Sequence, residues 1–331
     1  MTMTHVGPTI MTYVARSDLM YVGPSFSSAE RVMRRVVILV IALGIATTAV
    51  AQMSPHEKAA IDALAKEPAA SAFPIEVYPV SAPMPDHPGI AGVYVTILGG
   101  GLSPAINAKT GIFTAGALVY VRFLDAAGKV VASGSQEFPM HGLMSDAKNV
   151  LAKPLRFSRM FDLAPGRYRL EVSVYDEAGK QASVFRSTFE APSATMPVVG
   201  DLIIIKHADK LAPDQPVDPG NPLISKDRML LYPEYDAGVN RGLQPDVNFV
   251  VPMVLTPGSA PPEASLGLLT SKGETLASVS LPLGKAEDSG RLLAIGRVPL
   301  AKIPPGKYRL QITIGSGIDA RIRTAPLTVV D

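Results

Sequence analysis

The fold is decided by a stretch of sequence that occurs twice in this chain of 331 residues. Residues 163–174 read LAPGRYRLEVSV, and residues 303–314 read IPPGKYRLQITI. The tyrosines of the two copies, Tyr168 and Tyr308, are 140 positions apart, which is half of the 280 residues that follow Ala51. A repeat at this spacing predicts one structural unit that is present twice.

Each copy has the pattern of a β-strand that follows a tight turn. After the tyrosine, apolar residues alternate with polar ones, which is the period of a strand with one face in a core and the other in water. A Pro-Gly turn before such a strand, with a tyrosine at its start, resembles the tyrosine corner of Greek-key sandwiches, in which the phenol hydroxyl bonds to nearby backbone. We therefore expect a structural role for these positions: Pro165, Gly166, Tyr168, Pro305, Gly306 and Tyr308.

Similar short runs, separated by turn residues, predict strands along the rest of the chain. About seven short strands in ~100–140 residues, without long helical patterns, are typical of an immunoglobulin-like sandwich. The predicted strands are 75–80, 91–98, 117–124, 130–138, 155–162, 168–175, 182–190, 202–206, 229–232, 247–255, 265–269, 276–281, 292–298, 308–314 and 320–329.

The predicted fold class is therefore all-β, with two tandem immunoglobulin-like (Greek-key) β-sandwiches after an N-terminal signal peptide and a short helix. Residues 73–192 are the first predicted sandwich, named module 1 below, and residues 198–331 are the second, named module 2. The boundary is placed at 191–197, because this segment carries two prolines and small residues.

A basic and then apolar segment near the N-terminus is typical of an export signal. Two arginines precede the uncharged apolar run 36–46, and small residues at Ala49 and Ala51 flank a cleavage site. The alternative is an uncleaved membrane anchor, but even extended to Ala51 the apolar run has 16 residues, below the ~17–25 needed to span a bilayer. We therefore expect a cleaved signal peptide at 33–51, a periplasmic or secreted protein, and a non-native extension at 1–32 from an early start codon.

The predicted mature chain begins with a short helix and a linker at 52–72. Ser54 and Glu57 have the spacing of a capping box, and a proline occupies the first helical position between them. The apolar face of this helix is little more than Ile61 and Leu64. A helix with so narrow an apolar face is expected to be a loosely docked tether.

The composition excludes several classes of function. The chain has 31 Lys and Arg against 29 Asp and Glu, and the excess of +2 lies before the predicted cleavage site. A formally neutral mature chain is not expected to bind nucleic acid, and a cleaved signal leaves no stable membrane insertion. Neutrality leaves little charge repulsion against weak self-association. The absence of cysteine excludes disulfides, thiolate metal sites and cysteine nucleophiles.

None of the usual catalytic motifs is present in the sequence, and a pair of carboxylates that converges in the fold is the alternative that stays open. His56 and Glu57 begin a zinc-protease pattern, but Ala60 stands where the second histidine is required. No Gly-x-Ser-x-Gly elbow occurs, and the triple glycine at 99–101 lacks the Gly-Lys-Ser/Thr ending of a phosphate loop. We therefore expect a protein that is not an enzyme and that needs no cofactor.

Methionine and histidine residues gather in module 1 and suggest one metal. Thioether and imidazole ligands suit copper, particularly Cu(I), in an exported chain without cysteine. The alternative is that the methionines fill gaps in the packing while the histidines are solvated. The candidate copper ligands are Met84, His87, Met140, His141 and Met144.

Sandwiches of this kind bind partners through loops at their ends or through exposed strand edges. Four segments are long for hairpin connections and are candidate contact loops: 99–112, 139–152, 212–226 and 233–244. The predicted function is an exported, non-enzymatic interaction or structural protein of the cell envelope that binds a protein partner. The alternative is a periplasmic small-ligand or copper-binding module that uses the methionines and histidines of module 1.

The chain also resembles a known group of proteins over most of residues 74–331. The group is the von Willebrand factor type A-related proteins from acidobacteria, and the resemblance is to their C-terminal paired immunoglobulin-like region. Those proteins carry an upstream type A domain with an Asp-x-Ser-x-Ser metal site, and this sequence contains no such motif. The resemblance therefore implies paired sandwiches without metal-dependent adhesion. It is carried by residues 161–172, 175–179, 189–192, 200–204 and 300–310.

Overall fold

A computed structural model describes residues 53–98, 100–217, 221–233 and 238–331. Strands dominate this part of the chain, and they form antiparallel sheets apart from one short parallel pairing. The predicted all-β class with paired sandwiches is confirmed. The predicted signal peptide at 33–51 and the extension at 1–32 lie outside the described residues. Neither α-helix of the described part combines the length and the apolar character that a membrane-spanning helix requires.

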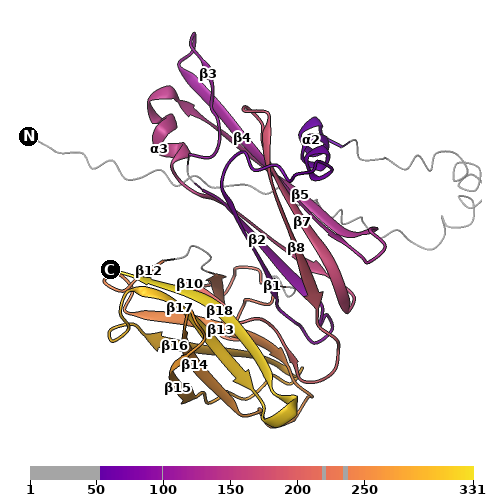
Figure 1. Cartoon of the computed structure of the whole chain (residues 1–331), viewed down its shortest axis with the longest axis vertical. Helices are drawn as coiled ribbons and strands as arrows, with labels where there is room; N and C mark the ends of the chain where they lie inside the picture. Colours follow the sequence, from indigo (N-terminus) through magenta and orange to yellow (C-terminus); the bar gives the residue numbers. More distant parts are fainter. Residues whose placement is uncertain (1–52, 99, 218–220, 234–237) are drawn as a thin grey trace, which may run out of the picture. The chain divides into compact units, whose positions relative to one another are not determined.

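Module 1 is a sandwich of two sheets (Figure 1). One sheet has the order β1-β2-β6, and the other has the order β5-β4-β7-β8, with β3 paired to the start of β4. The strands are β1 (Ile75–Ser81), β2 (Ile90–Ile97), β3 (Ala105–Asn107), β4 (Ile112–Leu124), β5 (Val130–Leu143), β6 (Leu155–Asp162), β7 (Gly166–Asp176) and β8 (Gln181–Ala191).

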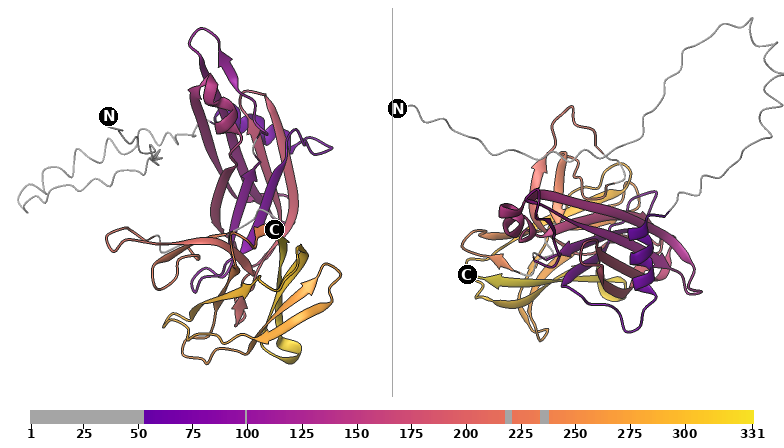
Figure 2. Two further views of the ribbon diagram at one scale, coloured as in Figure 1. Left: turned by 90° about the vertical axis from the view of Figure 1, so that its left-hand side faces the viewer. Right: turned by 90° about the horizontal axis from the view of Figure 1, so that it is seen from above.

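Module 2 is also a sandwich of two sheets, drawn from two further directions in Figure 2. One sheet has the order β11-β10-β13-β16, with β9 paired to β13, and the other has the order β12-β18-β17-β14-β15. The strands are β9 (Val198–Val199), β10 (Ile203–Lys210), β11 (Met229–Pro233), β12 (Val239–Asn240), β13 (Asp246–Val254), β14 (Ala264–Thr270), β15 (Thr275–Ser280), β16 (Arg291–Pro299), β17 (Gly306–Ile314) and β18 (Arg321–Val330).

The two modules share one strand order, as the repeat in the sequence predicts. Strands β1, β2, β4, β5, β6, β7 and β8 occupy the same places in their sheets as β10, β13, β14, β15, β16, β17 and β18. Each strand predicted from the sequence is present, with ends that differ by a few residues. The sequence did not predict β3, β9 and β12, because two or three residues are too few to show an alternating pattern.

Each module has a hydrophobic core between its own sheets. The core of module 1 is drawn from residues 73–191, and the core of module 2 from residues 199–329. Fully buried Phe123 contacts the rings of Phe161 and Phe189 with centroids 5.2 and 5.6 Å apart. The alternation along each strand therefore produces two cores that share no residue.

The contact expected of a tyrosine corner is formed in both copies. The Tyr168 hydroxyl donates to the Ala164 carbonyl oxygen at 2.7 Å, and the Tyr308 hydroxyl donates to the Pro304 carbonyl oxygen at 2.8 Å. Gly166 has a φ of +153°, which a residue with a side chain adopts only under strain. The bond from the tyrosine hydroxyl back to the turn therefore recurs at the entry into the equivalent strands β7 and β17.

The predicted N-terminal helix is present as α2 (Pro55–Leu64). The Ser54 side chain accepts a hydrogen bond from the Glu57 backbone N–H at 3.1 Å, as the capping-box spacing predicts. The expected loose docking is wrong, however. Leu64 is buried with Leu118 and Tyr120 of β4 in one apolar cluster, so α2 covers the outer face of a module 1 sheet.

The predicted linker after α2 also contacts module 1. The Val184 backbone N–H donates to the Ala70 carbonyl oxygen at 2.8 Å, and the Phe73 backbone N–H donates to the Ser183 hydroxyl at 2.9 Å. These bonds place the segment along the edge of β8. The segment therefore satisfies part of an edge that faces no other strand of its sheet.

A buried charge cluster lies on the sheet that α2 covers, which is the sheet of β4, β7 and β8. Glu171 is 3% exposed, and its carboxylate accepts from Arg122 Nε at 2.7 Å and lies 3.1 Å from Arg169 Nε. Arg186 is 3.7 Å from the same carboxylate and donates to the Leu64 carbonyl oxygen at the end of α2. The carboxylate thus has several positive partners, and one of them also holds the helix.

Candidate functional site

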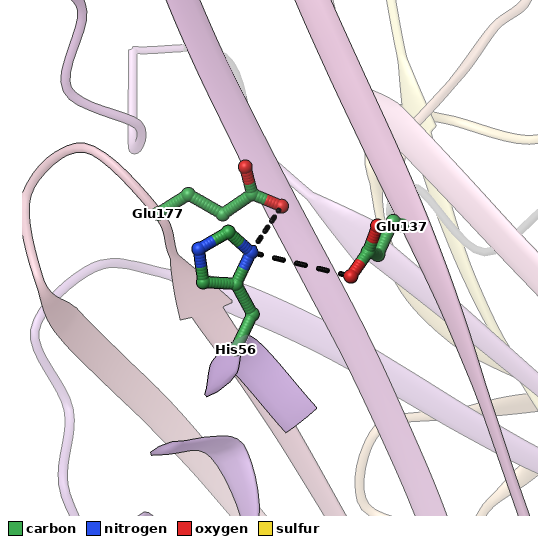
Figure 3. A group of neighbouring side chains, drawn as sticks. All are labelled: His56, Glu137 and Glu177. Atoms are coloured by element: carbon green, nitrogen blue, oxygen red, sulfur yellow. Dashed lines mark ion pairs between the residues drawn. The ribbon is translucent and has the colours of Figure 1, made fainter. Parts of the chain in front are cut away.

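A histidine and two glutamates from separate elements meet on module 1 (Figure 3). His56 lies in the first turn of α2, Glu137 lies on β5, and Glu177 lies in the turn between β7 and β8. Because α2 packs on the sheet, the imidazole of His56 lies next to the two carboxylates. One potential ligand atom of each side chain lies within 4.8 Å of the others.

The histidine is the centre of this group, named the His56 cluster below. Its Nδ1 is 3.3 Å from Glu177 Oε1 and 4.0 Å from Glu137 Oε1. The side chains of His56, Glu137 and Glu177 are 35%, 50% and 21% exposed. An imidazole nitrogen with two carboxylate oxygens, open to water on one side, is a ligand set that suits a divalent transition metal.

Neighbouring groups orient the two carboxylates. The Ser54 hydroxyl, which also caps α2, donates to Glu137 Oε1 at 3.3 Å. Glu177 donates its backbone N–H to the Gly116 carbonyl oxygen at 3.0 Å, and a Cβ on Gly116 would collide with the Glu177 carboxylate. The missing side chain of Gly116 therefore makes the space that this carboxylate occupies.

Sequence reasoning missed the His56 cluster. It noted His56 only as the start of an incomplete zinc-protease helix, and Glu137 and Glu177 come from elements that are far away in the chain. A ligand set drawn from a helix, an edge strand and a turn has no fixed spacing for a motif search to find. Its presence depends on the docking of α2, which is closer than the sequence predicts.

The structure divides the predicted copper ligands into two groups. Met84 and His87 lie in the turn before β2, where their backbones exchange two hydrogen bonds of 3.1 Å. His87 Nδ1 is 2.6 Å from Asp162 Oδ2, so this imidazole is paired with a carboxylate.

The second group lies at the other end of β2. Met140 packs partly buried against the core of module 1, whereas His141 and Met144 are exposed. Residues just after β2 bond to this region, since Gly100 donates its backbone N–H to the Leu151 carbonyl oxygen, and Leu151 ends the helix that follows Met144. No single site draws on both groups, and copper binding by either group alone stays a prediction.

The predicted contact loops are partly ordered elements. Strand β5 continues to Leu143 and is followed by a 3-10 turn (Met144–Asp146) and by α3 (Ala147–Leu151), so 139–152 is mostly regular structure. The loop 99–112 contains β3. The loops 212–226 and 233–244 contain residues outside the described part of the chain.

Among the described residues, one strand edge in module 2 has no neighbouring strand and is exposed along its whole length. All six residues of β15 are exposed, and β15 stands at the end of its sheet with β14 as its neighbour. Leu276 and Val279 on this strand are 54% and 58% exposed. Beside its C-terminal half lies a groove of about 690 Å³. Its lining includes Pro261, Pro262, Ser278, Val279 and Pro282.

Comparisons with known proteins give structural likenesses only. No family model and no curated protein matches the chain, so the relationship to von Willebrand factor type A-related proteins stays a prediction. A biofilm-associated protein (BSP domain) is 12% identical with a TM-score of 0.23 and is matched over 83% of this chain and 55% of its own. Trypsin-activated alpha-2-macroglobulin from Escherichia coli is 12% identical with a TM-score of 0.26, over 79% and 17%.

A tetra-tandem repeat from the extending region of a large adhesion protein is 13% identical with a TM-score of 0.20, over 77% of this chain and 50% of its own. The chain thus spans about half or less of the length of these proteins.

Proposed function

We propose that this chain is an exported, non-enzymatic protein of the cell envelope that binds an extended segment of a partner protein along β15. The observation that carries the proposal is the fully exposed edge strand Thr275–Ser280. A strand at the end of a sheet presents unpaired backbone N–H and C=O groups, which an added strand satisfies. Export is supported by the sequence at 33–51, which has the features of a signal peptide.

The chemistry of β15 favours an extended, mostly uncharged segment as its occupant. The strand contains no charged residue and no proline, which are the features that natural sheets use to block edge pairing. Val279 pairs with Leu266 of the core, so it continues the core face to the edge, while Leu276 is an exposed apolar side chain near the other end of the strand. A partner strand with apolar side chains beside these two positions would bury both.

The test uses a photo-crosslinking residue at Ser278 in the full chain expressed in its native host. The matched control carries the same residue at Thr313, which lies on β17 between two other strands. We expect a crosslink to one other protein from position 278 only. The substitution Val279→Lys should abolish it, because a charge at the edge opposes strand addition, while the thermal midpoint stays unchanged for so exposed a residue.

Three outcomes contradict the proposal. Equal crosslinking from positions 278 and 313 would mean that contact at β15 is unspecific. An adduct that survives Val279→Lys would mean that the edge is not the binding surface. An adduct with twice the mass of the chain would identify a second copy as the occupant, and self-association would then replace binding of a different protein.

A further inference from the structure

We propose that His56, Glu137 and Glu177 bind one divalent transition-metal ion, and that Zn²⁺ is the ion that suits the three ligands best. This site is separate from the candidate copper ligands and from the β15 edge. Its three ligands belong to α2, β5 and the turn after β7. A bound ion would therefore fasten the N-terminal helix to the sheet on which it lies.

The distances in the cluster match a metal bridge. Zinc binds imidazole nitrogen and carboxylate oxygen at about 2.0–2.2 Å with tetrahedral angles, which sets neighbouring ligand atoms about 3.4 Å apart. The distance from His56 Nδ1 to Glu177 Oε1 is 3.3 Å. Glu137 Oε1 is at 4.0 Å from the same nitrogen on a half-exposed side chain, so a small movement of this side chain would bring the oxygen to the required spacing. Two of the ligand atoms are thus already at the required spacing.

A second histidine in the same module provides an internal comparison. His87 Nδ1 lies 2.6 Å from Asp162 Oδ2, which is the distance of a charge-assisted hydrogen bond. Both carboxylate contacts of His56 are longer than the 2.7–2.9 Å typical of such a bond. A simple histidine–carboxylate pair is expected to have the His87 geometry. The wider spacing around His56 leaves room for an ion among the three side chains.

The charges and the ligand types select the class of ion. Two carboxylates balance the charge of one divalent cation, so the loaded site is formally neutral. Calcium and magnesium prefer ligand sets made entirely of oxygen, whereas an imidazole nitrogen favours zinc and related transition metals. The partial exposure of all three side chains leaves the remaining coordination position to water.

Two further residues position the ligands. The Ser54 hydroxyl holds the Glu137 oxygen that faces His56, and Gly116 provides the space for the Glu177 carboxylate. Outer-shell partners of metal ligands typically change affinity by 10–100-fold when they are removed. We therefore expect Ser54→Ala to weaken zinc binding by about 10-fold while it leaves the stoichiometry unchanged.

The experiment is a calorimetric titration of the full chain with ZnCl₂, after export in a bacterial host and treatment with a chelator that is then removed. We expect one Zn²⁺ per chain for the wild type. His56→Ala and Glu177→Gln should lose this binding event. The matched control His87→Ala removes the other paired histidine of module 1 and should keep it.

A second measurement separates metal binding from failure to fold. Hydrogen exchange of the α2 amides should slow on addition of zinc in the wild type and stay unchanged in Glu177→Gln. Far-UV circular dichroism of each chelator-treated variant shows whether the sheets are intact. Mg²⁺ at the same concentration should have no effect on either reading, because the site contains an imidazole ligand.

The proposal is wrong if the wild type binds no zinc in the titration. It is equally wrong if His56→Ala binds zinc as the wild type does, or if His87→Ala is the variant that loses the binding event. If hydrogen exchange in α2 is unchanged in the zinc-loaded wild type, the claim that the ion holds the helix on the sheet is wrong.

Discussion

The two modules share a strand order, but the outer faces of their equivalent sheets are different. In module 1, Glu171 on β7 stands in register between Arg122 on β4 and Arg186 on β8. The equivalent positions in module 2 are Gln311, Gly267 and Thr324. One module therefore concentrates charge at a place where the other has an amide, a glycine and a hydroxyl.

The difference in charge between the two outer faces agrees with what packs on each of them. In module 1, α2 packs on Leu118 and Tyr120, and Arg186 donates to carbonyl groups at the end of the helix. Within the described residues, module 2 has no α-helix, and Thr324 is exposed. The charge cluster and the helix thus belong together, because Arg186, which pairs with the buried carboxylate, also satisfies the end of the helix.

The equivalent edge strands β5 and β15 differ in the same way. Strand β5 carries Glu137 and Pro139, and Arg159 donates to the Ser135 carbonyl oxygen at 3.5 Å. A charge, a proline and an occupied carbonyl are all features that oppose the addition of another strand. Strand β15 contains neither a charged residue nor a proline. The edge strand β5 of module 1 is therefore protected against the addition of another strand, whereas the equivalent edge strand β15 of module 2 is not.

The largest effect is expected from Glu171→Gln, which gives module 1 the amide of module 2. Arg122 and Arg186 would lose their carboxylate in a buried setting, and breaking such a pair costs about 3 kcal/mol of unfolding free energy. Urea unfolding monitored by circular dichroism measures the loss. The control is Gln311→Ala, for which we expect a change within about 0.5 kcal/mol. Equal losses from both variants would remove the distinction between the two faces.

A smaller effect is expected from Leu64→Ala at the contact between α2 and the sheet. Leu64 is 3% exposed, and its truncation at this contact between a short helix and the sheet is expected to cost about 2 kcal/mol. Hydrogen exchange should increase in α2 and at Leu118 while it stays unchanged in β17 of module 2. Met53→Ala, at a residue that is 51% exposed, is the control. Unchanged exchange at Leu118 would mean that the helix does not protect the sheet.

The strands could be predicted from the sequence, but the packing of α2 on the sheet could not be predicted from the sequence of the helix alone. Alternation around Tyr168 and Tyr308 has a local period, so it can be read without knowledge of the fold. The contact of α2 with the sheet is also visible in the sequence, because β4 is apolar on both faces. Leu118 and Tyr120 lie on one face, and Val119 and Val121 lie on the other. Such a strand predicts a covered sheet. The narrow apolar face of the helix, taken alone, predicts loose docking, whereas the apolar outer face of β4 indicates a partner for it.

No pattern in the sequence indicates the His56 cluster. Its residues stand on three elements, and only the register of β5 with β4 and the docking of α2 bring them together. Nothing in the spacing of one histidine and two glutamates separates them from the other polar residues of the chain. A site of this kind can be found only when the tertiary contacts are known.

The smallest effect is expected at the feature that the two modules share. Tyr168→Phe and Tyr308→Phe each remove one hydroxyl hydrogen bond to a carbonyl oxygen four residues earlier. Tyr168 is 9% exposed and its bond to the Ala164 carbonyl is partly buried, so we expect a cost of about 1 kcal/mol. Tyr308 bonds in an exposed setting, where water replaces the hydroxyl, and the expected cost is about 0.5 kcal/mol. Urea unfolding of both variants measures the two costs, and a larger loss at Tyr308 would show that burial does not set the strength of the corner.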